Sequence, residues 1–282
     1  MKVLVTGATG FVGRHVVSRL LASGHTVVAM ARSEDRARTL PWFERVEFVA
    51  HDLQSAAWDW QKSAIPDVLI HLAWPGLPNY RDFFHIGKNL PTNLHFLEAA
   101  VQAGVPHLLV AGTCLEYGMQ YGPLGEEMET HPFTPYGFAK DALRKSLEIL
   151  QRRNPFTLQW VRLFYMYGEG QNPNSLLSQL DRALDEGRER FEMSAGDQLR
   201  DYLPIETIAR CFDWATTHPD MNGVINCCSG KPISVLDLVR QHLARRNGEI
   251  QLVRGYYPYP DYEPMAFWGV QEKLRRTGFI ID

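Results

Sequence analysis

A tyrosine and a lysine four positions apart are the pair of residues in this sequence best suited to acid–base chemistry. Tyr136 and Lys140 belong to the segment Pro-Tyr-Gly-Phe-Ala-Lys. Residues four apart share one face of a helix, so both side chains can reach the same substrate oxygen. A free phenol has a pKa of about 10, and a nearby ammonium group favours the phenolate. The spacing predicts that Tyr136 exchanges a proton with a substrate oxygen, the alternative being two residues of an ordinary amphipathic helix.

A glycine-rich segment near the N-terminus is typical of a phosphate-binding turn. It follows the apolar run 3–5 and precedes apolar residues at helical spacing. Gly7 permits a tight turn, Gly10 lets the backbone approach a pyrophosphate, and Gly13 allows close packing of helix on strand. Because this strand–turn–helix context is the required one, we expect a dinucleotide to bind here, rather than a purely structural turn. The residues expected to contact it are Gly7, Thr9, Gly10, Phe11, Val12 and Gly13.

Strand patterns alternate with helical patterns along the first half of the chain. An apolar-faced helix is predicted at 90–103. Short apolar runs predict buried strands at 3–5, 25–30, 46–49, 68–72 and 108–111. This alternation predicts an α/β fold of the Rossmann type, with a doubly wound parallel sheet.

The second half of the chain has a different pattern. Strands are predicted at 157–163 and 224–227, and helices at 176–186 and 205–215. Residues 255–264 are too rich in aromatic residues and proline for regular structure. We expect a dinucleotide-binding domain over 1–165, to which segments near 203–228 return, and a smaller C-terminal substrate-binding lobe over 166–282.

Composition and charge exclude several classes of protein. A formal charge of −3 argues against broad nucleic-acid binding, which needs clustered Lys and Arg. No apolar run approaches the roughly 20 residues that span a bilayer. Met1-Lys2 runs directly into the first strand, so we expect no signal peptide and a cytoplasmic location. The cysteines and histidines lack metal-type spacing, so we expect reduced thiols and no metal site.

Several segments, in order along the chain, resemble motifs of the extended short-chain dehydrogenase/reductase family, which includes sugar-nucleotide epimerases and dehydratases. The first is the Gly-x-x-Gly-x-x-Gly turn at 7–13. Asp52-Leu53 resembles the pair that holds the adenine ring, and His71-Leu72-Ala73 resembles the strand end beside the cofactor. Asn89 matches an asparagine that stabilises the active site. The resemblance covers most of the chain and implies a nicotinamide dinucleotide cofactor.

The resemblance extends to the residues that would carry out the reaction. The segment Thr-Cys-Leu-Glu-Tyr-Gly resembles Ser/Thr-x-x-x-Tyr-Gly, with Thr113 in the hydroxyl position. The match implies that Thr113 hydrogen-bonds the reacting oxygen, Tyr136 transfers the proton, and Lys140 tunes the phenol and holds the nicotinamide ribose. Sugar-nucleotide 4,6-dehydratases have Thr-Asp-Glu here, so the Thr-Cys-Leu of this chain predicts no dehydration. Glu116, one position later, is expected to face the other way if the segment is extended.

The end of the second predicted strand bears on the choice of cofactor. NAD enzymes usually place an acid there to bind the ribose 2′-hydroxyl, whereas this chain has Ala31 followed by Arg32. Without a carboxylate a 2′-phosphate is not repelled, and a guanidinium can bind it in bidentate fashion. Ser33 could add a hydroxyl donor. We therefore expect NADP(H), with NAD(H) as the alternative if Arg32 is only a solvated surface residue.

Two later segments resemble substrate-binding motifs of the family. Arg-Leu-Phe-Tyr-Met-Tyr-Gly resembles Arg-x-x-Asn-x-Tyr-Gly, with Tyr165 in place of an asparagine that often touches the substrate. Gln-Leu-Arg-Asp-Tyr resembles the stretch that binds the substrate diphosphate, with Arg200 as the phosphate clamp. The alternative for Arg200 is a salt bridge to Asp201 or Glu206. Further candidates for substrate contact are Cys114 and Asn174.

These features together imply a sugar-nucleotide enzyme. We expect NADPH-dependent reduction of a nucleotide-activated 4-keto-6-deoxy sugar at C4, with a nucleotide-sugar 4-epimerase that keeps a bound NAD as the alternative. A dinucleotide-sensing protein without turnover is disfavoured because the Thr, Tyr and Lys are all present. A flavonoid or steroid ketone is disfavoured by the arginine motif. Family members usually dimerise through the helices that correspond to 90–103 and 136–152, so a homodimer is expected.

Overall fold

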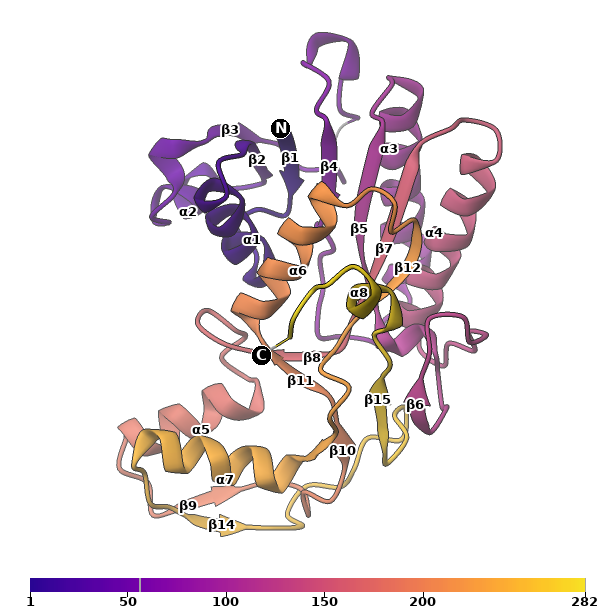
Figure 1. The fold of residues 1–282 in the computed structure, drawn as a ribbon. Helices are drawn as coiled ribbons and strands as arrows, with labels where there is room; N and C mark the ends of the chain where they lie inside the picture. The colour runs from indigo at the N-terminus through magenta and orange to yellow at the C-terminus, as the bar shows by residue number, and fades with distance from the viewer. Residues whose placement is uncertain (56, 282) are drawn as a thin grey trace.

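The computed structural model describes residues 1–55 and 57–281 of the chain (Figure 1). At its centre lies a seven-stranded sheet in the order β12-β7-β5-β4-β1-β2-β3, and every neighbouring pair is parallel. Its strands are β1 Lys2–Thr6, β2 Thr26–Ala31, β3 Glu47–Ala50, β4 Val68–His71, β5 His107–Thr113, β7 Thr157–Leu163 and β12 Gly223–Cys227. The predicted parallel Rossmann-type sheet is confirmed.

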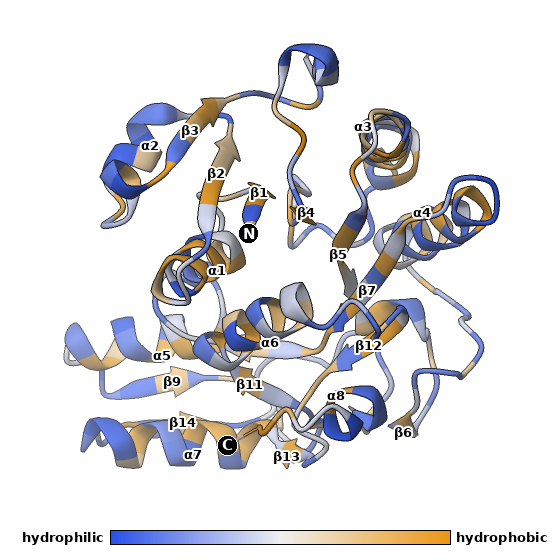
Figure 2. Ribbon diagram, turned by 45° about the horizontal axis from the view of Figure 1, so that its top comes forward, coloured by the Kyte–Doolittle hydropathy of each residue, from blue (hydrophilic) through white to orange (hydrophobic). Residues whose placement is uncertain are grey.

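Helices cover both faces of this sheet because alternate residues of a strand point to opposite sides. Val3 and Val5 of β1 share a buried core with α1 and α6, whereas Leu4 between them packs in a second core with α3 and α4. These helices are α1 Phe11–Ala22, α3 Leu90–Gln102, α4 Pro135–Gln151 and α6 Ile205–Thr217. Figure 2 shows hydrophobic residues concentrated on the inner strands β1, β2 and β4.

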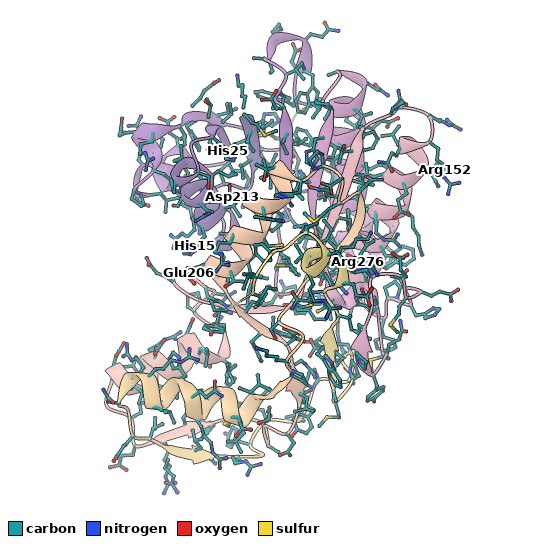
Figure 3. All side chains as sticks on the ribbon, in the orientation of Figure 1. His15, His25, Arg152, Glu206, Asp213 and Arg276 are labelled. Carbon is teal, nitrogen blue, oxygen red and sulfur yellow. The ribbon has the colours of Figure 1, made fainter. Side chains whose placement is uncertain are left out.

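A polar cluster adds to the contact between α1 and α6. The carboxylate of Asp213 on α6 accepts hydrogen bonds from Arg19 Nε at 2.9 Å and from the Ser23 hydroxyl at 2.7 Å. It also lies 3.4 Å from His25, and Figure 3 shows these two residues beside each other. A helix from the second half of the chain is therefore anchored to the segment that follows the glycine turn.

The C-terminal lobe has a small core of its own. Its helices α5 (Leu176–Asp185) and α7 (Val235–Arg246) pack with β9 (Arg190–Glu192) and β14 (Gln251–Val253) through residues such as Leu180, Phe191 and Val239. Three further short ladders lie outside the seven-stranded sheet. They are β8 Tyr165–Tyr167 with β11 Tyr202–Pro204, β10 Leu199–Arg200 with β13 Ile233–Ser234, and β6 Gly122–Leu124 with β15 Phe267–Gly269. Residues 255–264 contain no helix or strand, as predicted.

The remaining helical segments are short. They are α2 Glu34–Arg38, α8 Glu272–Arg276, the π-helical turn His85–Asn89 and the 3-10 turns Phe43–Arg45, Trp60–Lys62 and Cys114–Glu116. Among the described residues, no helix has both the length and the apolar character that a membrane span requires.

Candidate active site

The glycine turn after β1 is shaped by close backbone packing. Gly7 has a φ of +67°, and a Cβ added there would lie 2.8 Å from the backbone nitrogen of Ala73. A Cβ on Gly13 would lie 2.2 Å from the carbonyl oxygen of Gly7. Only glycine fits both positions without moving backbone, so the turn is held directly against α1 and the end of β4.

A buried chain of hydrogen bonds fixes the ends of β1 and β4 below this turn. The Thr6 hydroxyl accepts from the backbone nitrogens of Leu72 and Ala73 at 3.2 and 3.3 Å, and lies 2.9 Å from Nδ1 of His71. Nε2 of His71 lies 2.7 Å from Oδ1 of Asn93. Burial, with a contribution from Lys140, lowers the pKa of His71 to about 3, so the imidazole is neutral and serves as a structural link.

The turn borders a cavity of about 190 Å³ that brings together most of the predicted cofactor residues. Arg36, which the sequence prediction missed, also lines it from α2, whereas Arg32 precedes the N-cap of that helix. A second arginine shortly after Arg32 was the signal for it in the sequence. Ser33 is the N-cap of α2, with its hydroxyl accepting from Arg36 N at 3.2 Å. The predicted residues in the lining are Gly7, Thr9, Gly10, Arg32, Asp52, Leu53, Leu72 and Ala73. The other predicted cofactor residues, Phe11, Val12, Gly13, Ser33, Tyr136 and Lys140, are not part of the lining.

The catalytic candidates come from the end of β5 and the start of α4. Thr113 is the last residue of β5. Helix α4 begins at Pro135, because the hydroxyl of the N-cap residue Thr134 accepts a hydrogen bond from Gly137 N at 3.1 Å. Lys140, only 2% exposed, donates to the carbonyl of Ala111 at 2.9 Å. A Cβ on Gly137 would lie 2.6 Å from the Leu115 carbonyl, so the first turn of α4 rests directly on the segment after Thr113.

Burial governs the protonation of this pair. Burial raises the pKa of the Tyr136 phenol, and the nearby Tyr80 and Glu116 raise it further. A hydrogen bond with Thr113 lowers this pKa and so opposes them. Burial also lowers the pKa of Lys140 to about 7, although the charge of Glu116 raises it. At neutral pH the structure therefore holds a phenol that can donate a proton beside a lysine that is close to its titration midpoint.

Aromatic rings surround the phenol and shield it from solvent. The ring centroids of His85, Tyr80 and Trp74 lie 5.2, 5.5 and 6.0 Å from that of Tyr136. Nζ of Lys140 lies 4.0 Å from the centroid of Trp74. Trp74 Nε1 in turn bonds to His85, which belongs to the π-helical turn that also contains Asn89.

The substrate candidate Arg200 is buried and has a partner that the sequence prediction did not identify. Its Nη2 donates to the Glu263 carboxylate at 3.1 Å, so the expected alternatives Asp201 and Glu206 were the wrong partners. Asp201 instead accepts from the backbone nitrogens of Ser229 and Gly230. Glu263 comes from the aromatic segment before β15, 63 residues later in the chain.

Other substrate candidates differ in their placement. Tyr165 lies beside Arg200, whose Cζ is 5.6 Å from the centroid of the tyrosine ring. The buried hydroxyl of Tyr165 makes no hydrogen bond among the described residues. Cys114 is buried, and burial raises the pKa of its thiol. Asn174 lies in the exposed loop before α5, where its backbone bonds to Asn172 and Gln179, apart from the other candidates.

The segment around Glu263 also reaches the loop that carries Tyr80. Asp261 forms an ion pair with Arg81, whose guanidinium lies 5.2 Å from the ring centroid of Tyr262. The Tyr262 ring is 6.0 Å from that of Tyr80, which packs at a tilt against the ring of Tyr136. Through Tyr80, the segment 261–263 thus connects Tyr136 to Arg200. In the part of the chain that the structure describes, no cluster of His, Cys, Asp or Glu could hold a metal ion.

Comparison with known proteins agrees with this arrangement. A family model described as the NAD dependent epimerase/dehydratase family matches residues 3–228. The chain belongs to that family. The predicted resemblance to extended short-chain dehydrogenases/reductases is confirmed.

Similar members of the NAD dependent epimerase/dehydratase family act on nucleotide sugars. A dTDP-6-deoxy-L-talose 4-dehydrogenase (NAD(+)) of Aggregatibacter actinomycetemcomitans is 30% identical over 96% of this chain and 100% of its own length. A GDP-6-deoxy-D-mannose reductase of Pseudomonas aeruginosa is 27% identical over 90% of this chain and 83% of its own. The solved structure of MoeE5 with UDP-glucuronic acid and NAD superimposes with a TM-score of 0.85 at 28% identity, over 100% of this chain and 94% of that one.

Proposed function

We propose that this protein exchanges a hydride between NADP(H) and C4 of a nucleotide-activated 6-deoxy sugar, with reduction of the 4-keto form as the favoured direction. The observation that carries the proposal is the convergence of Thr113, Tyr136 and Lys140 at the end of β5, next to the dinucleotide cavity. Cys114 and Leu115 stand where a dehydratase needs two acids, so the site supports hydride transfer without elimination of water.

The residues of the cavity fit a phosphorylated dinucleotide. The glycine turn leaves no space for a Cβ at Gly7 or Gly13, and the N-terminus of α1 lies at its end. Arg32 and Arg36 line the cavity beside Ala31, where a carboxylate would repel a 2′-phosphate. The A. actinomycetemcomitans relative is named as an NAD(+) enzyme, so the proposed preference for NADP(H) rests on these two guanidinium groups.

The proposed chemistry divides among three side chains. NADPH, when bound, supplies the hydride. Tyr136 donates its phenol proton to the C4 oxygen, and the Thr113 hydroxyl hydrogen-bonds the same oxygen and the phenolate that forms. The Lys140 ammonium, held on Ala111 and Trp74, stabilises that phenolate electrostatically. The two relatives described above, a 4-dehydrogenase and a reductase of nucleotide-linked 6-deoxy sugars, support this reaction type.

Two copies of the chain would associate through the outer faces of α3 and α4. Phe138 and Ile149 on α4 are 49% and 58% exposed, and with Ala142 and Lys145 they form a row at three- and four-residue spacing. An isologous four-helix contact would bury this row. Sedimentation should give a homodimer at micromolar concentration, and Phe138→Glu should give a monomer. A wild-type monomer would contradict the assembly.

A substrate panel tests the proposed function. The purified protein is incubated with NADPH or NADH and a set of nucleotide 4-keto-6-deoxy sugars, and cofactor absorbance and products are followed. We expect net loss of NADPH with formation of one C4 epimer. Interconversion of two sugar nucleotides without net loss of cofactor would favour the 4-epimerase. No turnover of any sugar nucleotide, with intact dinucleotide binding, would favour a sensing protein.

A further inference from the structure

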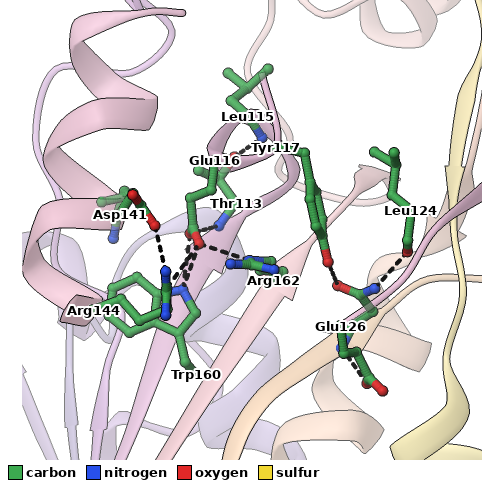
Figure 4. A network of polar contacts seen from close by, with 12 residues as sticks. Thr113, Leu115, Glu116, Tyr117, Leu124, Glu126, Asp141, Arg144, Trp160 and Arg162 are labelled. Carbon is green, nitrogen blue, oxygen red and sulfur yellow. Dashed lines mark hydrogen bonds and ion pairs between the residues drawn. The ribbon is translucent and has the colours of Figure 1, made fainter. Parts of the chain in front are cut away.

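A buried carboxylate behind the catalytic threonine has no place in the reaction as described so far. Glu116 is 0% exposed and lies at the centre of the network in Figure 4. Its Oε2 accepts from Arg162 Nε at 2.8 Å, and its two oxygens accept from Trp160 Nε1 at 2.9 and 3.1 Å. Its Oε1 also accepts from the backbone nitrogen of Thr113 at 2.8 Å. The carboxylate therefore connects the catalytic residue to β7.

The contact with Thr113 closes a capping box around the turn Cys114–Glu116. The Thr113 hydroxyl accepts from Leu115 N at 3.3 Å while Glu116 binds Thr113 N, so the two side chains fix each other. Cys114–Glu116 is a 3-10 turn. The prediction that Glu116 faces the other way assumed an extended segment, and that assumption was wrong. Its side chain folds back on β5, where a Cβ on Gly112 would lie 2.7 Å from Oε1.

The charge of Glu116 also acts on the catalytic pair. Although burial lowers the pKa of Lys140, Glu116 raises it, and Glu116 adds to the burial that raises the pKa of Tyr136. The groups that face Glu116 are Arg144, Lys140 and Tyr136 on α4, Arg162 on β7, and Cys114 and Tyr117 beside it. The groups that face Lys140 are Glu116, His71 and His85.

We propose that Glu116 is a positioning residue of the active site, which fixes Thr113 through its backbone N–H and places a negative charge behind Tyr136 and Lys140. The proposal rests on the proposed roles of those three residues. A buried ion pair with Arg162 is by itself weak evidence even for stability, because desolvation offsets the attraction. Two observations favour a role in shaping the site: the direct hydrogen bond from Thr113 N to Glu116, and the close approach of Glu116 to Gly112, which leaves no room for a Cβ there.

Glu116→Gln tests the charge. The amide oxygen can still accept from Thr113 N, but the negative charge is lost and Arg162 is left uncompensated. Tyr136 and Lys140 should then lose their protons at lower pH, so the pH limb of kcat should move down by on the order of half a unit. The Lys140 titration midpoint, followed by NMR of 13Cε-labelled lysine and assigned with Lys140→Met, should fall likewise without any substrate. Dinucleotide affinity should be unchanged.

The matched control is Glu126→Gln. Glu126 is another buried carboxylate, which accepts from Asn226 N at 2.9 Å and Lys273 N at 3.1 Å but makes no hydrogen bond to Thr113 within the described residues. Both substitutions remove a buried charge that bonds to backbone. Only Glu116→Gln should move the kcat limb and the Lys140 midpoint. If both variants lose stability alike and neither moves the Lys140 midpoint, Glu116 is structural and the proposal is wrong.

Glu116→Asp tests the positioning and remains informative if the Gln variant does not fold. It keeps the charge but shortens the reach to Thr113, so the pH limb should stay in place. The value of kcat should fall by roughly ten- to a hundredfold, since a misplacement of about 1 Å can cost about 10²-fold. An unchanged kcat would overturn the positioning role. Lack of turnover in the wild type would instead overturn the proposed function, whereas the Lys140 titration would still test Glu116.

Discussion

The cofactor cavity and the substrate side of the site are built in different ways. Around the cofactor turn the shape comes from backbone, because Gly7 packs against the end of β4 and Gly13 packs against Gly7. On the substrate side it comes from charged and aromatic side chains of distant segments, as in the pair of Arg200 with Glu263. A site formed by closely packed backbone tolerates few substitutions. The ligand specificity of a site formed by side chains can be changed by a single substitution. The first region therefore carries the pattern that identifies the family, and we propose that the second selects the substrate.

The same difference explains which parts could be predicted from the sequence. The turn and the Tyr136–Lys140 pair are local patterns, so their placement followed from strand and helix periodicity. Glu263 was missed because it lies 63 positions after Arg200 in the sequence and meets it only through the tertiary fold. Trp74, whose ring centroid lies 4.0 Å from Nζ of Lys140, was not predicted as a site residue. Contacts of this kind arise from tertiary packing, and a single sequence carries no local signal for them.

The largest expected effect belongs to neither region but to the chemistry between them. Tyr136→Phe removes the phenol oxygen and keeps the ring that packs on Tyr80 and His85. Turnover should fall by roughly 10²–10⁴-fold, while affinities for NADP(H) and the sugar nucleotide change little. Thr113→Val should cost less because the proton donor remains. Single-turnover rates and direct binding measurements check this. Near-full activity of the Phe variant would contradict the mechanism.

The pH dependence of reduction should follow Lys140. Burial lowers the pKa of its ammonium to about 7, so the charge is present below that pH and is lost as the pH rises through it. The phenolate formed on Tyr136 then loses its electrostatic partner, and kcat should fall up to about tenfold per pH unit. Lys140→Met should be slow at every pH and should lack this limb. A wild-type rate that stays constant to about two units above neutrality would show that the lysine charge is not required.

Substitutions at Arg200 and Glu263 should act on the substrate side alone, and in opposite directions. Arg200→Gln should raise the KM of the sugar nucleotide by about 30-fold, the equivalent of a charge-assisted hydrogen bond of about 2 kcal/mol. Glu263→Gln should lower that KM, because Arg200 is released to bind phosphate, at some loss of thermal stability. Steady-state kinetics and melting temperatures measure both effects. A change of NADP(H) affinity in either variant would break the separation of the two regions.

The smallest effect is expected at the outer end of the cofactor cavity. The wild type should bind NADP(H) at least about tenfold more tightly than NAD(H), or about 1.4 kcal/mol. Arg32→Ala should remove most of that margin, and Arg36→Ala part of it, because both guanidinium groups line the cavity. Sugar-nucleotide binding should not change. Calorimetric titration with the two cofactors would decide, and equal affinities in the wild type would favour the NAD-dependent alternatives.

The most direct measurement follows the hydride itself. NADPH carrying deuterium at the transferable position of the nicotinamide is incubated with the protein and the sugar nucleotide that turns over in the panel. The product is then analysed by NMR and mass spectrometry. The proposed function predicts one deuterium at C4 of the sugar for each NADPH consumed, and none at any other carbon. Deuterium at another carbon, or product formed without consumption of NADPH, would contradict C4 reduction by this protein.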